Sequence, residues 1–336
     1  MIKSVKTLYG GLFLIALISF TSIYFSEVGI FKSAGVSSLI IAIILGVIYG
    51  NTVHHRTPSE WFAGISFAQK RLLRLGIILY GFRITFQQIA QVGVAAMLLD
   101  VFVVSSILLL GYFLGVKLFK LDKKLSVMIA CGSSICGAAA VLGAEPVVKA
   151  RPHETSIAVA TVVIFGTIAM FLFAPIVSAL GYPVNWQGIA LGSTVHEVAQ
   201  VVAAGSAISE EVTDIAVIVK LARVMLLIPV LIVLGFIFGR NSGDKDSSIM
   251  KVFPWFAIFF VVASGVNSLH IIPQTALNWI NIFDNFLLTM AMAALGVETN
   301  MGKVRQVGIK PFLLAGVIFL ILIAYLFIPT FLAGRV

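Results

Sequence analysis

Long apolar runs constrain this chain more than any other feature of its sequence. Of its 336 residues, 60% are hydrophobic and only 11% are charged, whereas a soluble domain keeps about 25% charged residues. Runs of roughly 18 or more apolar residues have the length that a helix needs to cross about 30 Å of hydrocarbon. The alternating ten-residue strands of a membrane barrel are not seen. The sequence therefore predicts an all-α polytopic membrane protein, in which each run satisfies its own backbone hydrogen bonds.

Eleven apolar segments can be placed along the chain, and short loops separate them. They lie at about 8–26, 34–50, 72–90, 95–117, 125–146, 155–180, 185–207, 212–239, 252–269, 275–297 and 310–334. No small-residue cleavage site follows the first segment, so we expect it to be retained as a helix. The stretch 58–68 is too short to span and is expected at the membrane interface. Residues 1–336 are thus predicted to form a single membrane transporter domain.

Most of the 23 basic residues lie in loops that alternate with loops holding one lysine and most of the loop acids. This pattern orients a membrane protein with its basic loops in the cytoplasm and predicts a cytoplasmic N-terminus. The net charge of +9 then reflects topology, and no nucleic-acid partner is expected.

Two segments do not fit a topology in which every apolar segment spans the membrane. If all eleven segments spanned, Lys149 and Arg151 would face outside, against the charge rule. The conflict disappears if 125–146 and 185–207 are broken or re-entrant segments that dip from opposite sides, which gives about 9–11 transmembrane segments. Their sequences, CGSSICG and LGSTVHEVAQVVAAG, are rich in small and polar residues that favour helix breaks. Two continuous helices that use small residues for close packing are the alternative.

Short matches indicate internal repeats. Residues 78–93 align with 293–308, which pairs Gly81 with Gly296 and the closing Gln-Val-Gly of each stretch. GSS at 132–134 likewise aligns with GST at 192–194. In the nine-span topology the members of each pair run in opposite directions, as in the inverted repeats of secondary transporters.

Ionisable residues inside apolar segments are costly and mark candidate sites. They are Arg83, Asp100, Glu145, His196, Glu197, Lys220, Arg223, Asp284 and Glu298. Asp100 and Asp284 lie near segment ends, where we expect them to face the headgroup region.

The segment 185–207 carries the densest polar cluster. Ser193, His196, Glu197 and Gln200 follow the i, i+3, i+4, i+7 spacing of one helix face, and Thr194 lies beside them. A histidine next to a carboxylate can relay protons near neutral pH. We therefore predict a coupling or proton-relay role for His196, Glu197, Gln200 and Glu145.

Lys220 and Arg223 are three residues apart and share a helix face. Two buried cations need anions, supplied either by Glu145 and Glu197 or by a substrate. If the Gly-Ser pairs open half-helices, their free N–H groups would add a second anion-binding element. The predicted substrate-binding residues are Gly132, Ser133, Ser134, Gly192, Ser193, Thr194, Lys220 and Arg223.

Five motifs also carry a family resemblance: LRLGIILYGFRIT (73–85), ACGSSICGAAAV (130–141), GSTVHEVAQVVAAG (192–205), KLARVMLLIPV (220–230) and ALGVETN (294–300). Together they resemble the YeiH-type bacterial inner-membrane proteins, the proposed sulfate exporters. The resemblance covers nearly the whole chain and implies multi-pass insertion in a bacterial inner membrane and export of sulfate or a small sulfonate. Members are grouped with the cation–proton antiporter and bile-acid symporter superfamily, which implies inverted repeats and discontinuous helices that cross at mid-membrane.

Other functions are less well supported by the residues. His196-Glu197 begins like a zinc-binding HExxH motif, but position 200 is Gln, so no metal site is predicted. No oriented third member accompanies a Cys–His pair, so we expect neither an enzyme nor a cofactor. An anion channel and a sodium- or proton-coupled transporter of another organic anion stay open. The small-residue faces 111–115 and 235–239 fit packing within one protomer or in a homo-oligomer.

Overall fold

The computed structural model describes residues 2–29, 31, 37–53, 57–238, 255–299 and 308–328. Every regular element in these residues is a helix, which confirms the all-α prediction. The helices long and apolar enough to cross a membrane in these residues lie at Leu8–Glu27, Val92–Leu118, His153–Ala179, Glu210–Phe238 and Gln274–Glu298, and shorter apolar helices accompany them. The chain divides into two compact units, residues 1–90 with 255–302 (unit 1) and 91–254 with 303–336 (unit 2).

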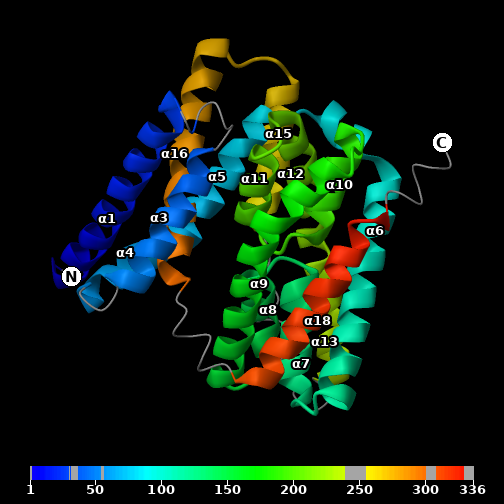
Figure 1. Cartoon of the computed structure of the whole chain (residues 1–336). Helices are drawn as coiled ribbons and strands as arrows, with labels where there is room; N and C mark the ends of the chain where they lie inside the picture. Colours follow the sequence, from blue (N-terminus) through cyan, green and yellow to red (C-terminus); the bar gives the residue numbers. More distant parts are fainter. Residues whose placement is uncertain are drawn as a thin grey trace. The chain divides into compact units, whose positions relative to one another are not determined.

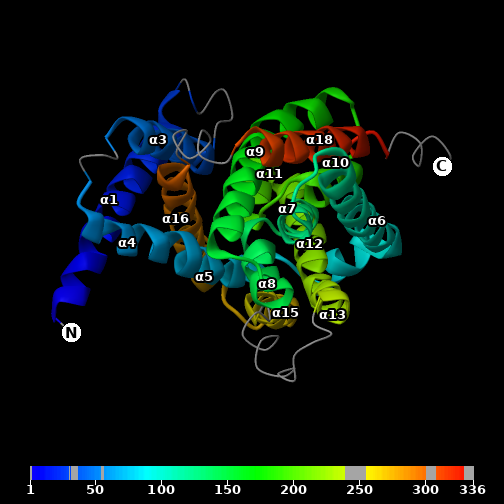
Figure 2. The ribbon, with the colours of Figure 1, turned by 90° about the horizontal axis from the view of Figure 1, so that it is seen from below.

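Unit 1 is built on close contacts between long helices. Its main helices are α1 (Ile2–Glu27), α3 (Ser38–Thr52), α4 (Phe62–Phe67), α5 (Leu73–Tyr80), α15 (Trp255–Ser268) and α16 (Gln274–Glu298). The helices α3 and α16 pack side by side (Figures 1 and 2). A Cβ at Gly46 or at Gly296 would meet the backbone of the other helix, so these two glycines allow the close approach.

The helical path between residues 59 and 113 differs from the one expected. Residues 59–83 form one nearly continuous helical stretch through α4, a π turn at Ala68–Leu72 and α5, so 58–68 is not a separate interfacial segment. The chain leaves this helix at Ile84, and α6 (Phe86–Phe113) begins two residues later. The expected segment 72–90 therefore straddles a break. Thr85 and Gln88 form a reciprocal cap at this point, and this Thr-x-x-Gln spacing was the signal that our segment assignment missed.

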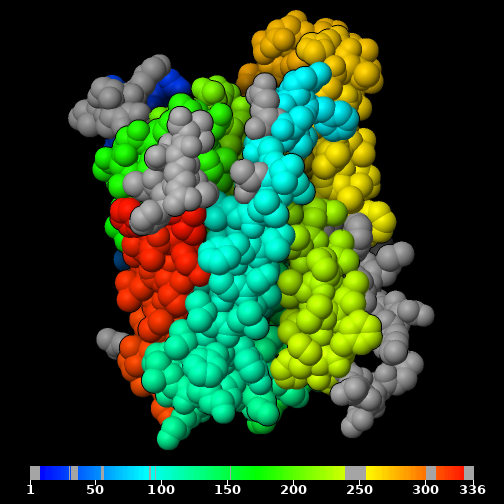
Figure 3. All heavy atoms as spheres, turned by 90° about the vertical axis from the view of Figure 1, so that its right-hand side faces the viewer, coloured from blue at the N-terminus to red at the C-terminus, as the bar shows by residue number. Residues whose placement is uncertain are grey.

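Unit 2 contains most of the remaining helices. They are α7 (Lys123–Ser134), α8 (Ala138–Val148), α9 (Pro152–Ala179), α10 (Val184–Thr194), α11 (Val198–Ser206), α12 (Glu210–Met225), α13 (Leu227–Phe238) and α18 (Ile309–Tyr325). On one face of unit 2, α6 lies between α18 and α13 (Figure 3). Leu98 and Leu109 of α6 and Phe236 of α13 are largely exposed. Exposed large apolar side chains on long apolar helices fit a lipid-facing surface.

The segment 212–239 is divided in two. The helix α12 ends at Met225, and α13 begins at Leu227. Pro229 lies in the first turn of α13, where its missing N–H removes no helical hydrogen bond. In a continuous helix its ring would instead clash with the carbonyl of residue 225.

The segments 125–146 and 185–207 are both broken hairpins, as predicted. The start of α7 and the end of α8 lie together, since Lys124 Nζ donates to the Lys149 carbonyl at 2.7 Å. For the second hairpin, Gly188 near the start of α10 packs against Ile215, and Gly205 of α11 packs against Thr213. Both ends of the α10–α11 hairpin thus lie at the first turns of α12, so each hairpin returns to the end of unit 2 from which it began.

The two hairpins open at opposite ends of unit 2. The helix α9 begins just after α8 ends, and α10 begins just after α9 ends. A helix of 28 residues is about 42 Å long, so the open ends are separated by the full length of α9. Figure 1 shows α7 and α8 in the lower part of unit 2 and α10 and α11 in the upper part.

The repeat seen in the sequence extends to the backbone. The helices α7 and α10 end at Ser134 and Thr194, and α8 and α11 begin at Ala138 and Val198, which preserves the 60-residue offset throughout. Gly93 (φ 75°, ψ 173°) and Gly308 (φ 78°, ψ 155°), which pair at the 215-residue offset, share one unusual conformation.

The other aligned positions agree where they are described. A Cβ at Gly81 would meet the Phe260 carbonyl of α15, and one at Gly296 would meet the Ile43 carbonyl of α3. Each glycine therefore allows a neighbouring helix to approach. The aligned Gln306 and Val307 lie outside the described residues.

The shared glycine conformation gives a test of the repeat. Ala at position 93 or 308 should lower the free energy of unfolding by about 1–3 kcal/mol, because this region of φ/ψ is essentially restricted to glycine. A Cβ at either site would meet nothing within 4 Å, so the cost comes from the backbone alone. Thermal unfolding in detergent would measure it. Gly235→Ala, on α13 where only one side-chain atom lies within 4 Å, is the control and should not destabilise.

Candidate functional site

The tips of the two broken hairpins meet beside the middle of α9. At the α7–α8 tip, a Cβ at Gly132 would meet Val162 of α9. At the α10–α11 tip, Gly166 of α9 lies against the amide of Gln200. The two tips contact each other directly, since the Ala138 N–H donates to Glu197 Oε1 at 3.0 Å.

We call the place where the two hairpin tips meet the crossing. Glu197 is the negative group there. Its side chain accepts from the first turn of its own helix α11, while its backbone N–H donates to Gln200 Oε1 at 3.1 Å. The same carboxylate accepts from Ala138, the first residue of α8. Unpaired N–H groups at a helix start carry partial positive charge. One carboxylate therefore caps the N-terminal ends of two half-helices.

Two cationic side chains of α12 bind to the C-terminal end of a half-helix. Lys220 Nζ donates to the Val195 carbonyl at 2.5 Å, and Arg223 donates to the Ser193 carbonyl. Both carbonyls belong to the last turn of α10 or to the break after it. Both cationic side chains are fully buried, and each stabilises the negative C-terminal end of α10.

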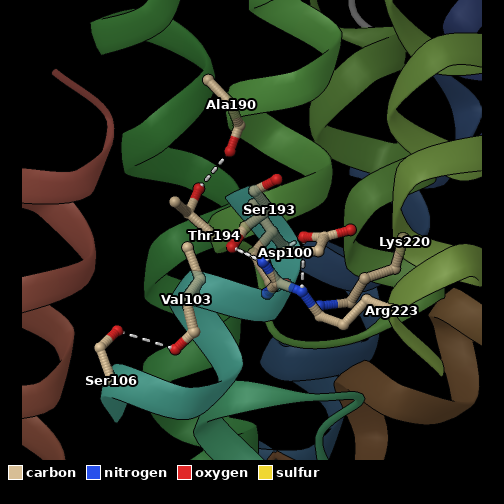
Figure 4. A network of polar contacts seen from close by, with 9 residues as sticks. Asp100, Val103, Ser106, Ala190, Ser193, Thr194, Lys220 and Arg223 are labelled. Atoms are coloured by element: carbon tan, nitrogen blue, oxygen red, sulfur yellow. Dashed lines mark hydrogen bonds and ion pairs between the residues drawn. The ribbon is translucent and has the colours of Figure 1, made fainter. Parts of the chain in front are cut away.

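Arg223 also forms an ion pair that we did not expect. Its Nη2 and Nε atoms lie 2.7 Å and 3.0 Å from Asp100 Oδ1 on α6 (Figure 4). Asp100 is only 2% exposed, so the expectation that it faces the headgroups is wrong. Its position near the start of an apolar segment was misleading, because the residue faces the hairpins rather than lipid.

Several polar atoms at the crossing are buried without a hydrogen-bond partner in the part of the chain that is described. They are Asp100 Oδ2, Ser193 Oγ, His196 Nδ1, Gln200 Nε2 and Arg223 Nη1. Buried polar groups are normally paired, so a cluster of five exceptions needs an explanation. The guanidinium and amide nitrogens can only donate, and a hydroxyl or imidazole can also donate. The crossing therefore offers more donors than acceptors.

The structure brings together only part of the predicted site. Ser193, His196, Glu197, Gln200, Lys220 and Arg223 meet at the crossing. Thr194 Oγ1 and Ser134 Oγ bond to carbonyls of their own helices. Glu145 lies on α8 two turns beyond the tip, and among the described residues no ion pair joins it to Lys220 or Arg223.

The role expected for the Gly-Ser pairs is corrected. Gly132, Ser133 and Ser134 lie in the last turn of α7, and Gly192, Ser193 and Thr194 in the last turn of α10. These pairs end half-helices rather than open them. The N–H groups of the helix starts belong instead to the residues that follow each break, from Ala138 and from Val198 onward.

Unit 1 contains a second, partly buried ion pair. Arg83 Nε donates to Asp284 Oδ2 at 3.1 Å and Arg83 Nη2 to the Asn281 carbonyl at 3.0 Å. Asp284 is fully buried, so the expectation that it faces the headgroups is also wrong. Asp284 lies well inside α16, where its carboxylate faces Arg83 rather than an end of the helix.

The Asp100–Arg223 pair can be tested by removing one charge at a time. Asp100→Asn should lower the free energy of unfolding by about 3–5 kcal/mol, because it leaves a buried guanidinium without its counter-ion. The double variant Asp100→Leu/Arg223→Met should recover much of this loss. Equal losses in the single and double variants, measured by thermal unfolding, would contradict this description of the pair.

Known proteins are similar in sequence to this chain over most of its length. A family model described as "Conserved hypothetical protein 698" matches residues 10–315. The UPF0324 inner membrane protein YeiH of Escherichia coli K12 is 49% identical over 316 residues, which cover 92% of this chain and 89% of the relative. A UPF0324 membrane protein of Bacteroides thetaiotaomicron is 45% identical over 312 residues, covering 91% and 92%.

The relative from Salmonella typhimurium, also named inner membrane protein YeiH, is 46% identical over 312 residues. These names agree with the apolar helices of the structure in placing the chain in a membrane, in contact with lipid. With a family model matched over most of the chain and such identities across nine-tenths of it, the chain belongs to the UPF0324 (YeiH) family of membrane proteins.

Proposed function

We propose that this protein is a secondary active transporter of a small anion and that the crossing of the two hairpins is its substrate site. The observation that carries the proposal is the group of buried donors at the crossing that have no hydrogen-bond partner among the described residues. An oxyanion has only acceptor oxygens, so it would satisfy Ser193, Gln200 and Arg223 together. Discontinuous helices from two repeats that meet near mid-membrane are the usual setting of such a site.

Sulfate or a small sulfonate is the proposed substrate, and export the proposed direction. A compact tetrahedral oxyanion matches donors that come from three directions: the end of α10, the start of α11 and one turn of α12. The direction and the sulfur chemistry follow the family resemblance of the sequence motifs. The proposed setting is the bacterial inner membrane with a cytoplasmic N-terminus, and the protein has no enzymatic activity in this scheme.

The division of the chain offers a route to alternating access. Both hairpins, both cations and Asp100 belong to unit 2. Because the site is built within one unit, that unit can carry a bound anion as a rigid body while the other unit stays in place. This kind of movement of one repeat-built body against another is common in secondary transporters.

Counterflow of labelled sulfate in proteoliposomes would test the proposal. Vesicles preloaded with unlabelled sulfate should accumulate the label, and a pH gradient should change the rate. Lys220→Gln should abolish the flux while the protein stays folded and monodisperse, because it removes a cation from the crossing. If neither sulfate nor methanesulfonate exchanges through the folded wild-type protein, the substrate proposal is wrong.

A hydroxyl without a structural partner gives a sharper test of the site. Ser193→Ala should hardly change the melting temperature, since Ser193 Oγ has no partner among the described residues. It should raise the KM for the transported anion by about tenfold, since a hydrogen bond to a charged group contributes roughly 1.5 kcal/mol. Ser126→Ala on α7, which loses a bond to the Asp122 carbonyl, is the control and should leave KM unchanged. An unaltered KM in Ser193→Ala would exclude this hydroxyl from the site.

A further inference from the structure

The charges at the crossing are already balanced before any substrate arrives. Lys220 and Arg223 are matched in number by Asp100 and Glu197. An added anion would place a further negative charge near Glu197, whose carboxylate takes up the N–H groups at the starts of α8 and α11. Two like charges at close range repel strongly at the low effective dielectric of a protein interior. An anion can therefore bind well only if one negative charge at the crossing is removed.

We propose that Glu197 takes up one proton from solution when the anion binds and releases it when the anion leaves. The carboxylate becomes a neutral acid, which can donate to the anion through its new O–H, while the N–H groups at the two helix starts become available to the anion. No covalent bond forms or breaks, and the proton returns to solution on the side where the anion is released. Anion and proton are thus carried in the same direction, so during export a proton leaves with each anion, and the outward gradient of the anion, not the inward proton gradient, supplies the driving force. This inference rests on the proposed function, because it assigns the coupling ion of the same site.

The other titratable groups around Glu197 are held in ways that make them poorer carriers. Arg223 is bonded to Asp100 and to the Ser193 carbonyl, and Lys220 is bonded to the Val195 carbonyl. Protonating Asp100 would leave Arg223 without its counter-ion. Cys136 lies in the facing break, next to Gly137, which packs against the Glu197 side chain. A thiol can release a proton but cannot remove a negative charge by gaining one.

The helices packed around Glu197 contain few other ionisable residues that could take up the proton. The helix α9 has no ionisable residue after Glu154, and α10 and α11 have none at all. On α8 the ionisable residue is Glu145, two turns from the tip. His196 precedes Glu197 in the break, and its Nδ1 has no hydrogen-bond partner in the part of the chain that the structure describes, which makes it the main rival for the proton. The test must therefore separate His196 from Glu197.

The first measurement is the affinity of the purified, full-length protein for labelled sulfate and methanesulfonate as a function of pH. Uptake of one proton per anion should raise Kd by about tenfold per pH unit above the range where the carrier titrates. Glu197→Gln keeps an oxygen that can accept from Ala138 but has no charge. Its Kd should be independent of pH and no weaker than that of the wild type at high pH. Glu211→Gln, the same change at an exposed acid on α12, should keep the wild-type slope.

The main result of a second measurement comes from the wild-type protein. Addition of anion to the wild-type protein in weak buffer should remove one proton per bound anion from solution. The infrared difference spectrum should gain the carbonyl stretch of a protonated carboxylic acid, and this band should be missing in Glu197→Gln. Anion binding by the wild type without proton uptake would overturn the inference and leave the proposed function standing.

The remaining outcomes are also decisive. A wild-type slope that persists in Glu197→Gln but disappears in His196→Gln would assign the proton to His196 and overturn the inference. If neither sulfate nor methanesulfonate binds to the wild type at any pH, the proposed function fails, and this inference fails with it.

Discussion

Interrupting a helix inside an apolar protein exposes backbone groups that water cannot satisfy, and the centre of unit 2 is organised around this cost. Each hairpin tip leaves one helix end that carries partial negative charge and another that carries partial positive charge. Lys220 and Arg223 stabilise the end of α10, and Glu197 stabilises the starts of α8 and α11. In a low-dielectric environment such charges stabilise the broken helix ends.

The same groups that stabilise the breaks are suited to bind an ion. The bonds within the crossing do not use the full capacity of Ser193, Gln200 and Arg223. A site built from helix ends and buried charges is held together by electrostatics, so a substrate with charge can exchange with an internal group at modest cost. This is why Glu197 has a double role in our proposal, as the cap of two helices in the absence of substrate and as the proton carrier in its presence.

Much of the architecture was predictable because a membrane requires long apolar helices and a fixed placement of basic loops. Apolar runs gave the all-helical class, and the conflict between Lys149, Arg151 and the charge rule pointed to the two hairpins. The repeats were visible as short matches, and the backbone of Gly93 and Gly308 supports them. The break at Ile84 was missed although Thr85 and Gln88 form a capping pair, since we assigned segments by hydropathy and a cap barely changes it.

The sequence by itself determined which residues are polar within apolar segments and at what spacing. This was enough to single out as site candidates six residues that meet at the crossing: Ser193, His196, Glu197, Gln200, Lys220 and Arg223. Only the tertiary structure decided how they pair. It joined Asp100 to Arg223 across 123 positions of the chain, left Glu145 outside the crossing, and showed that the Gly-Ser pairs end half-helices. The physical reason is that hydropathy and periodicity act over a few turns of one helix, whereas the partner of a buried charge is set by which helices pack against each other.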